Sequence, residues 1–179
     1  MEATNQSGGQ STSQFAGQPA QSRGFTMTRV LPASRDAVWA AWTEPERLRW
    51  FAGVEPGVDF EPSVDLRVGG AWRVHLYQPD GEDYFTGGIY QEIVPNERLV
   101  FAWGAAGGWP ELDPSRVDDV PVVTIELADG ADGTVMTTSF GFADTVPDAD
   151  VAKWFDLGIR AGWSDTIGRL APALASTAP

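Results

Sequence analysis

The chain has 179 residues, a hydrophobic fraction of 42% and a formal net charge of -13, which together fit one acidic domain with a substantial core. It contains no cysteine and a single histidine, His75, which excludes disulfides, thiolate nucleophiles, Cys-bound zinc, iron–sulfur clusters and any metal site built on two histidines. The negative charge opposes binding to nucleic acid and to anionic membrane surfaces. We therefore expect neither a nucleic-acid partner nor a membrane partner.

The N-terminal residues differ in composition from the rest of the chain. Residues 1–23 are rich in Ser, Gln, Gly and Thr, which bury too little apolar surface to offset chain entropy, so we predict a disordered tail. We expect one folded domain over residues 24–172 and a flexible C-terminus over 173–179. No basic region followed by an apolar stretch marks a secretory signal, and a cytoplasmic location is expected.

The folded part opens with a predicted strand over Phe25–Leu31, followed by two short helices. Ser34 is placed as the N-cap of the first helix, with Asp36 in its first turn. Thr43 is placed as the cap of the second helix, with Pro45 near its first position.

The period of the pattern then changes from helical spacing to alternation, which predicts strands. These strands are expected over residues 59–66, 71–77, 84–92, 99–103, 122–127 and 135–142. Gly, Pro, Asn and Asp turns lie between most of them, which favours antiparallel pairing of neighbours. One connection, residues 104–121, is a long Gly- and Pro-rich loop of the kind that is often functional.

A long helix is predicted over about 148–170, and Pro172 is expected to end it. Its apolar or small residues fall on one helical face; they are Val151, Trp154, Phe155, Gly158, Ile159, Gly162, Trp163, Ile167 and Leu170. The element order predicts an α+β fold in which one curved antiparallel sheet wraps around this helix.

Eight Trp and nine Phe are many for this length and suggest an apolar pocket, although they also suit an ordinary core. Alternation turns Trp72, Val74 and Leu76 to the inside, and likewise Phe85, Gly87 and Ile89 in the next strand. It turns His75, Tyr77 and Tyr90 outward. The predicted ligand-binding residues are Trp50, Phe51, Trp72, Val74, Leu76, Phe85, Ile89, Phe101, Trp103, Trp109, Phe140, Phe142, Trp154, Phe155, Gly158, Gly162 and Trp163.

The sequence supplies little for catalysis. His75 has no nucleophile or orienting acid in a recognisable motif, and the carboxylates fall in surface-like clusters without calcium-loop spacing. We assign no catalytic residue, no metal ligand and no cofactor.

Several segments in order along the chain resemble one protein family. They are residues 36–43 (DAVWAAWT), 45–48 (PERL), 50–51 (WF), 65–72 (DLRVGGAW), 79–81 (PDG), 87–103 (GGIYQEIVPNERLVFAW), 123–127 (VTIEL) and 162–163 (GW). On these segments the chain is similar to the START/SRPBCC superfamily, in the branch that resembles the C-terminal domain of the activator of the heat-shock protein 90 ATPase.

The resemblance implies a helix-grip fold with a cavity between the sheet and the long helix. It implies an apolar small-molecule ligand such as a polyketide or an enediyne-like natural product. It leaves open a polyketide cyclase or hydrolase, and a chaperone-linked interaction module; we favour a binding protein over an enzyme because the predicted inward faces hold almost no proton carrier. The oligomeric state stays open.

Members of this branch include resistance proteins of enediyne producers, which bind the toxin and are cut by it. A diradical would take hydrogen from a glycine Cα, and oxygen capture would then break the backbone. The candidate glycines are Gly104, Gly107 and Gly108 in the long loop, with Gly158 and Gly162 as second choices. The chain departs from the family in lacking a histidine in residues 135–142 and in the length of the loop that carries Trp109.

Overall fold

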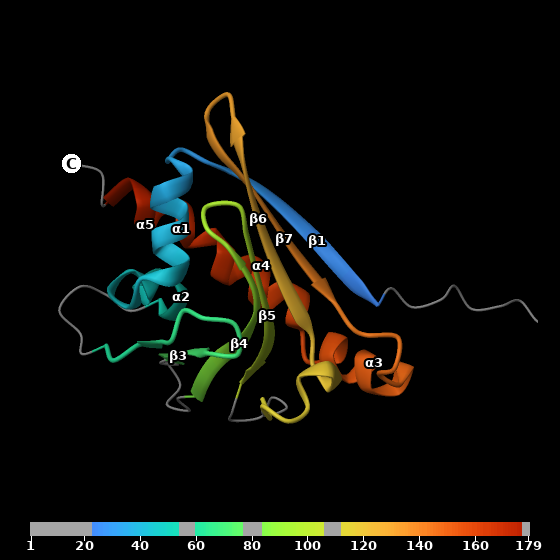
Figure 1. The fold of residues 1–179 in the computed structure, drawn as a ribbon. Coiled ribbons are helices and arrows are strands. Elements are labelled where there is room, and N and C mark those ends of the chain that lie inside the picture. Colours follow the sequence, from blue (N-terminus) through green and yellow to red (C-terminus); the bar gives the residue numbers. More distant parts are fainter. Residues whose placement is uncertain (1–22, 54–59, 77–83, 106–111, 177–179) are drawn as a thin grey trace, which may run out of the picture.

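The computed structural model describes residues 23–53, 60–76, 84–105 and 112–176 as one antiparallel sheet with helices against it (Figure 1). The strands are β1 (Gly24–Leu31), β2 (Ser63–Val64), β3 (Ala71–Leu76), β4 (Tyr84–Val94), β5 (Arg98–Ala105), β6 (Val122–Gly130) and β7 (Gly133–Gly141). The helices are α1 (Arg35–Thr43), η1 (Pro45–Leu48), α2 (Arg49–Ala52), η2 (Val117–Asp119), α3 (Asp148–Asp156), α4 (Ile159–Gly168) and α5 (Leu170–Ser176).

The seven strands run in the order β1-β7-β6-β5-β4-β3-β2, so the first strand pairs with the last and the rest form a meander. The C-terminal helices α4 and α5 lie against one face of the curved sheet (Figure 1). This confirms the predicted α+β helix-grip architecture with two short helices after the first strand. The predicted tail, residues 1–22, lies outside the described residues, as do residues 177–179.

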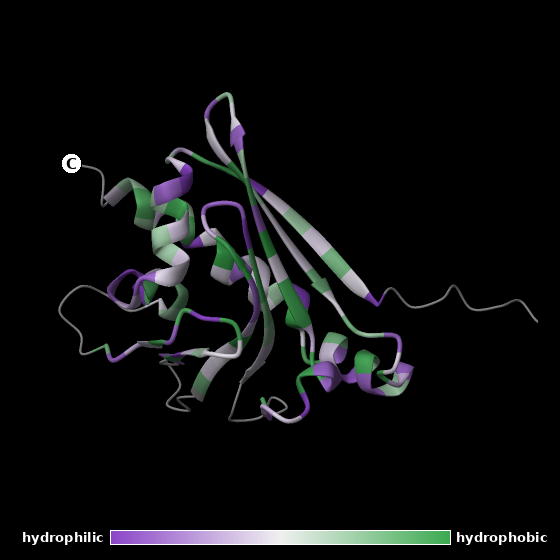
Figure 2. Ribbon diagram, viewed as in Figure 1, coloured by the Kyte–Doolittle hydropathy of each residue, from purple (hydrophilic) through white to green (hydrophobic). Residues whose placement is uncertain are grey.

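Alternation places the core correctly along most strands. In β7, every second residue from Thr134 to Phe140 is buried, and the residues between them are partly exposed. Figure 2 shows a similar alternation as bands of colour along β1. The inner face of the sheet and the helices that cover it therefore enclose one continuous core.

The start of the first helix was predicted correctly, and the cap of the second was not. The Ser34 hydroxyl accepts a hydrogen bond from the Ala37 amide at 3.3 Å. Thr43 is the last residue of α1 instead of a cap, and its hydroxyl donates to the Trp39 carbonyl at 2.8 Å. Glu44 precedes η1 and makes no capping hydrogen bond with its side chain. Pro45 follows at the first helical position, where its fixed φ suits a helix and it has no N–H that needs a partner.

The strand predicted over residues 59–66 is also shorter than expected. Among the described residues 60–66, only Ser63 and Val64 form ladder pairs, with Arg73 and Trp72 of β3. Pro62 has no amide hydrogen to donate to a ladder, which accounts for the late start of β2.

The predicted single C-terminal helix is divided into three segments. Gly158 has a φ of 83°, in the left-handed region, so α3 ends before it and α4 begins after it. The helical segment also continues to Ser176, past Pro172, where we expected its end. No described helix is long and apolar enough to span a membrane.

Because α3 and α4 are separated at Gly158, alanine substitutions at Gly158 and Gly162 are expected to change the free energy of unfolding in opposite directions. Gly158→Ala is expected to lower the free energy of unfolding by about 1 kcal/mol, because alanine is strained at positive φ. Gly162→Ala, inside α4 with open space around the position of a Cβ, is expected to raise it by up to about 1 kcal/mol. Urea denaturation of both variants checks this, and a loss in both would contradict it.

Candidate aromatic ligand site

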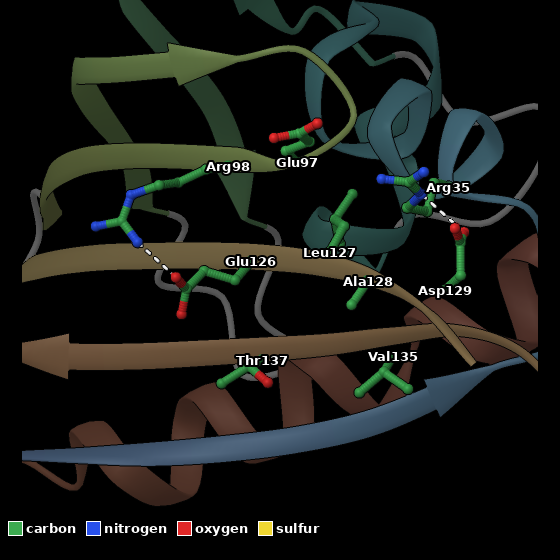
Figure 3. Close-up of a pocket in the computed structure, with 9 residues that line it drawn as sticks. All are labelled: Arg35, Glu97, Arg98, Glu126, Leu127, Ala128, Asp129, Val135 and Thr137. Atoms are coloured by element: carbon green, nitrogen blue, oxygen red, sulfur yellow. Dashed lines mark hydrogen bonds and ion pairs between the residues drawn. The ribbon is translucent and has the colours of Figure 1, made fainter.

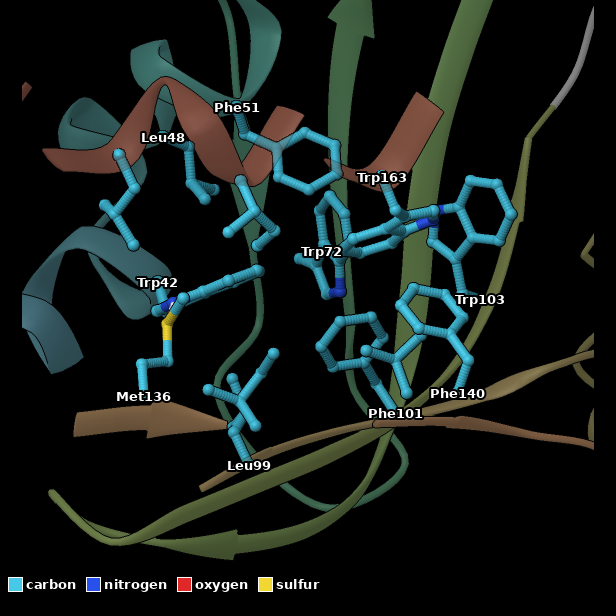
Figure 4. Close-up of a cluster of buried hydrophobic side chains, with 14 of the residues drawn as sticks. Trp42, Leu48, Phe51, Trp72, Leu99, Phe101, Trp103, Met136, Phe140 and Trp163 are labelled. Atoms are coloured by element: carbon cyan, nitrogen blue, oxygen red, sulfur yellow. Dashed lines mark hydrogen bonds between the residues drawn. The ribbon is translucent and has the colours of Figure 1, made fainter. Parts of the chain in front are cut away.

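An aromatic cluster fills the space between the inner face of the sheet and the helices. It consists of Trp42, Trp50, Phe51, Trp72, Phe101, Trp103, Phe140, Trp154 and Trp163, all of them buried. The ring centroid of Trp163 of α4 lies 4.5 Å from that of Phe140, 5.4 Å from Phe51 and 5.4 Å from Trp103 (Figure 4). Most of these contacts are edge-on, the geometry that aromatic quadrupoles favour.

Most residues predicted to bind a ligand lie in or beside this cluster. Those that the structure buries on the inside are Trp50, Phe51, Trp72, Val74, Phe101, Trp103, Phe140, Phe142, Trp154 and Trp163. Leu76 and Phe155 are partly buried against the core. Trp109 lies outside the described residues.

The predicted facing of β4 was wrong. Phe85 is 41% exposed and lies on the outer face. The centroid of its ring is 4.0 Å from the Arg73 Cζ and 4.6 Å from the centroid of the His75 ring. Ile89 is on the same outer side, and Tyr90 is buried instead. A β-bulge between Tyr90 and Glu92 shifts the register, so one alternation does not hold through the whole of β4.

The candidate glycines are placed differently from the prediction. Gly162 is exposed, on the side of α4 that faces away from the core. Gly104 is buried, and a Cβ added there would lie 2.7 Å from the Leu112 Cβ. Gly107 and Gly108 lie outside the described residues.

Gly88 is an interior glycine that the sequence analysis did not single out. Its cross-strand neighbours are Trp72 on one side and Trp103 on the other. A Cβ at this position would lie 2.6 Å from both the Trp72 Nε1 and a Phe101 ring carbon. Gly88 therefore leaves room for two rings to pack on the sheet. The sequence indicated this close approach only through a glycine in the middle of a strand.

Four polar side-chain atoms inside the core have no hydrogen-bond partner among the described residues. They are the indole Nε1 atoms of Trp72 and Trp163, the Tyr90 hydroxyl and the Thr138 hydroxyl. We call them the unpaired interior groups. Their residues are at most 3% exposed, so bulk water does not reach them. Buried polar groups usually find a partner, so four unpaired groups in one core require an explanation.

Other indoles in the same core are paired. Trp50 Nε1 donates to the Ala41 carbonyl at 2.8 Å, and Trp42 Nε1 to the Met136 sulfur at 3.4 Å. Trp103 Nε1 donates to the Thr86 hydroxyl at 2.8 Å, which in turn donates to the Gly104 carbonyl at 3.1 Å. The indoles of Trp72 and Trp163 therefore differ from these three, because they lie in the same core without an acceptor among the described residues.

The interior holds little that could move a proton. No Asp, Glu, Lys, Arg or His among the described residues is buried, and no group of His, Asp and Glu within those ranges could hold a metal ion. Burial, with a smaller contribution from the charge of Asp65, raises the pKa of the Tyr90 phenol well above its usual value near 10. Tyr90 therefore stays protonated at neutral pH.

The raised pKa of Tyr90 predicts an alkaline loss of stability. Above about pH 10 the unfolded chain releases the phenolic proton while the folded protein retains it, so stability falls as the pH rises. Tyr90→Phe is expected to flatten this fall between pH 9.5 and 11.5 (a range set by the usual tyrosine pKa). Urea midpoints of both proteins across that range check the prediction, and parallel curves would contradict it.

A hollow lies outside the core, over one end of β5, β6 and β7 (Figure 3). It has a volume of about 500 Å³ and is lined by Arg35, Glu97, Arg98, Glu126, Leu127, Ala128, Asp129, Val135 and Thr137. Arg35 pairs with Asp129 at 2.8 Å, and Arg98 with Glu126 at 2.6 Å. Because both arginines already have carboxylate partners, this groove is a weaker candidate for ligand binding than the aromatic cluster.

Comparison with solved structures shows the same fold in many proteins. Ms6760 from Mycobacterium smegmatis is 22% identical, with a TM-score of 0.68 over 87% of this chain and 93% of that one. Mll3558 from Rhizobium loti is 28% identical, with a TM-score of 0.60 over 84% of this chain and 95% of that one.

DynU16, a protein of the dynemicin biosynthetic locus, is 26% identical, with a TM-score of 0.60. The match covers 88% of this chain and 49% of DynU16, so the likeness concerns about half of that protein. No curated protein is similar enough to the chain to count as a match.

A family match covers most of the described chain. Residues 32–175 match the family described as activator of Hsp90 ATPase homolog 1-like protein. The matched range begins just after β1, includes all the other described strands, and extends into the last described helix, α5. The chain therefore belongs to the activator of Hsp90 ATPase homolog 1-like family.

Proposed function

We propose that the protein binds a hydrophobic small molecule, of the polyketide or enediyne-like class, between the sheet and its C-terminal helices. The observation that carries this proposal is the aromatic cluster, in which indole and phenyl rings from α1, α2, α4 and the sheet meet inside the fold. Large aromatic surfaces are the usual lining of sites for apolar ligands.

The rings are close together in this structure, so a ligand has to separate them. Phe51 is the ring best placed to move, because its centroid is 5.1 Å from Trp72 and 5.4 Å from Trp163. It comes from α2, a helix of only four residues. We propose that a flat ligand takes the place of the Phe51 ring between these two indoles.

A binding role fits the interior better than an acid–base mechanism. General acid–base catalysis needs a positioned group with a pKa near the working pH. The titratable group that the described interior offers is Tyr90, whose raised pKa makes it a hydrogen-bond donor and a poor base. A polyketide cyclase or hydrolase is therefore the weaker alternative.

The likeness to DynU16 of the dynemicin biosynthetic locus supports an enediyne-like ligand, because dynemicin is an enediyne. We propose that this protein protects cytoplasmic targets in one of two ways. It either sequesters such a toxin, or its own backbone is cut by the toxin instead of those targets. In the second case the fragment masses would identify the glycine that is attacked. Gly104 and Gly88 are the candidates beside the aromatic cluster in the described chain.

Intrinsic tryptophan fluorescence during titration with enediynes and aromatic polyketides tests the proposal, followed by intact mass measurement. Quenching with unchanged mass would support sequestration. Quenching followed by two fragments would support sacrifice. A folded protein that responds to no member of the panel would contradict ligand binding, and co-precipitation from lysate would then test a chaperone-linked interaction instead.

A further inference from the structure

We propose that the ligand is recognised through carbonyl-type oxygens that accept hydrogen bonds from Trp72 and Trp163, as in a quinone. This inference rests on the proposed function and narrows the ligand class from any apolar molecule to a fused-ring compound with acceptor oxygens. Figure 4 shows both indoles among the rings of the aromatic cluster.

The indole ring has one polar group. Its N–H donates a hydrogen bond and cannot accept one. Trp72 and Trp163 are each 3% exposed and have no acceptor in the described chain, whereas Trp50 and Trp103 each have one. A donor buried without an acceptor is costly, so a bound molecule that brings two acceptors is favoured over one that brings none.

The two indoles border the same space. Both of their rings contact Phe51, from opposite elements of the fold: Trp72 belongs to β3 and Trp163 to α4. A ligand that replaces the Phe51 ring would therefore lie between the Trp72 ring on the sheet side and the Trp163 ring on the helix side.

The hydroxyl groups extend the same pattern along the sheet. Tyr90 and Trp72 both contact the ring of Phe101, and Thr138 is on the inner face of β7 between Met136 and Phe140. A hydroxyl can donate or accept, so these two adapt to whichever group the ligand presents. The indoles cannot adapt, and they set the requirement for acceptor oxygens.

The described interior has no buried charged residue, which does not suit the other common class of apolar ligand, the anionic lipids. The carboxylate of a fatty acid or other anionic lipid is costly to bury unless a cation pairs with it. No Arg, Lys or His in the described part of the chain is buried. The unpaired interior groups therefore suit a neutral ligand with dispersed carbonyl oxygens.

A matched pair of probes tests this: menadione, which is 2-methyl-1,4-naphthoquinone, and 2-methylnaphthalene, which has the same skeleton without the oxygens. The chain has no cysteine, so the quinone has no thiol to alkylate. Calorimetric titration is expected to show tighter binding of menadione by on the order of tenfold, the value of two neutral hydrogen bonds.

The indole region of a ¹H–¹⁵N spectrum gives a second readout on the unmodified protein. Menadione is expected to move two of the eight tryptophan side-chain N–H signals downfield, as new hydrogen bonds do. Trp72→Phe and Trp163→Phe assign those signals, and Trp50→Phe identifies a control signal that is already hydrogen-bonded and is expected to stay in place. The count of shifted signals decides the question even where a variant does not fold.

The outcomes separate this inference from the proposed function. If both probes bind equally and no indole signal moves downfield, the donors do not recognise the ligand, while binding of apolar rings still holds. If neither probe binds and the panel of natural products also gives no response, both proposals fail. Tighter binding of menadione, with shifts confined to Trp72 and Trp163, supports the assignment.

Discussion

Replacing Phe51 with alanine is expected to lower the free energy of unfolding by about 3–5 kcal/mol, the usual cost of truncating a buried phenylalanine. The side chain is 3% exposed, and its ring contacts Trp42, Trp50, Trp72 and Trp163. Neighbouring indoles are too large to collapse fully into the space, so a cavity remains. Urea denaturation followed by circular dichroism measures the loss.

The same variant is expected to bind aromatic ligands more tightly than the natural protein. A ligand then fills an existing apolar cavity instead of displacing a packed ring, as engineered cavities of about 150 Å³ do for small aromatic molecules. The backbone of α2 is expected to stay in place, because Arg169 donates to the Phe51 carbonyl at 3.1 Å and Trp50 to the Ala41 carbonyl at 2.8 Å.

Phe25→Ala is the matched control. Phe25 is also buried, but it stacks on Phe140 at 4.5 Å in the first strand and does not contact Phe51. It is expected to lose stability without gaining affinity in calorimetric titrations. Weaker binding by Phe51→Ala than by the natural protein would show that the Phe51 ring is part of the ligand surface, contrary to the displacement proposed above.

Local patterns predicted the parts of the fold that depend on nearest neighbours. The alternation in β7 has no bulge, and the Ser34 cap needs only the amide three residues later, so both follow directly from the sequence. The same reasoning failed where one residue changes the phase. The bulge between Tyr90 and Glu92 interrupts the alternation of β4, and Gly158 at positive φ ends α3 before α4 begins.

In β4 the apolar pattern itself was misleading. In β4 the outward residues Phe85 and Ile89 are more hydrophobic than the inward residues Thr86 and Gly88. Tertiary contacts explain the inversion: Gly88 gives room to two rings, and Thr86 accepts from an indole. A pattern read from one strand cannot contain the shapes of the side chains on the next.

The candidate site was predicted in outline only. The abundance of tryptophan predicted an aromatic interior, and the structure gathers most of the expected rings there. Which indoles have acceptors could not be predicted, because Trp50 and Trp72 differ only in what lies beside them in three dimensions. The unpaired interior groups are a property of packing, so only the structure identifies them.

Two buried threonines allow a direct test of which interior groups are paired. Thr86 is 1% exposed and Thr138 is fully buried, and both face the core from strands. The Thr86 hydroxyl joins the Trp103 indole to the Gly104 carbonyl, whereas the Thr138 hydroxyl has no partner among the described residues. The same substitution, threonine to valine, is therefore expected to have different effects at the two positions.

Thr86→Val is expected to cost about 2–3 kcal/mol of unfolding free energy, since it removes the acceptor of one buried group and the donor to another. Thr138→Val is expected to be neutral or to stabilise by up to about 1 kcal/mol, since it removes a buried hydroxyl that makes no hydrogen bond. Urea midpoints for both variants, measured without ligand, check the contrast. Equal losses would mean that the Thr138 hydroxyl has a partner in solution, and a polar ligand would then have to compete for it.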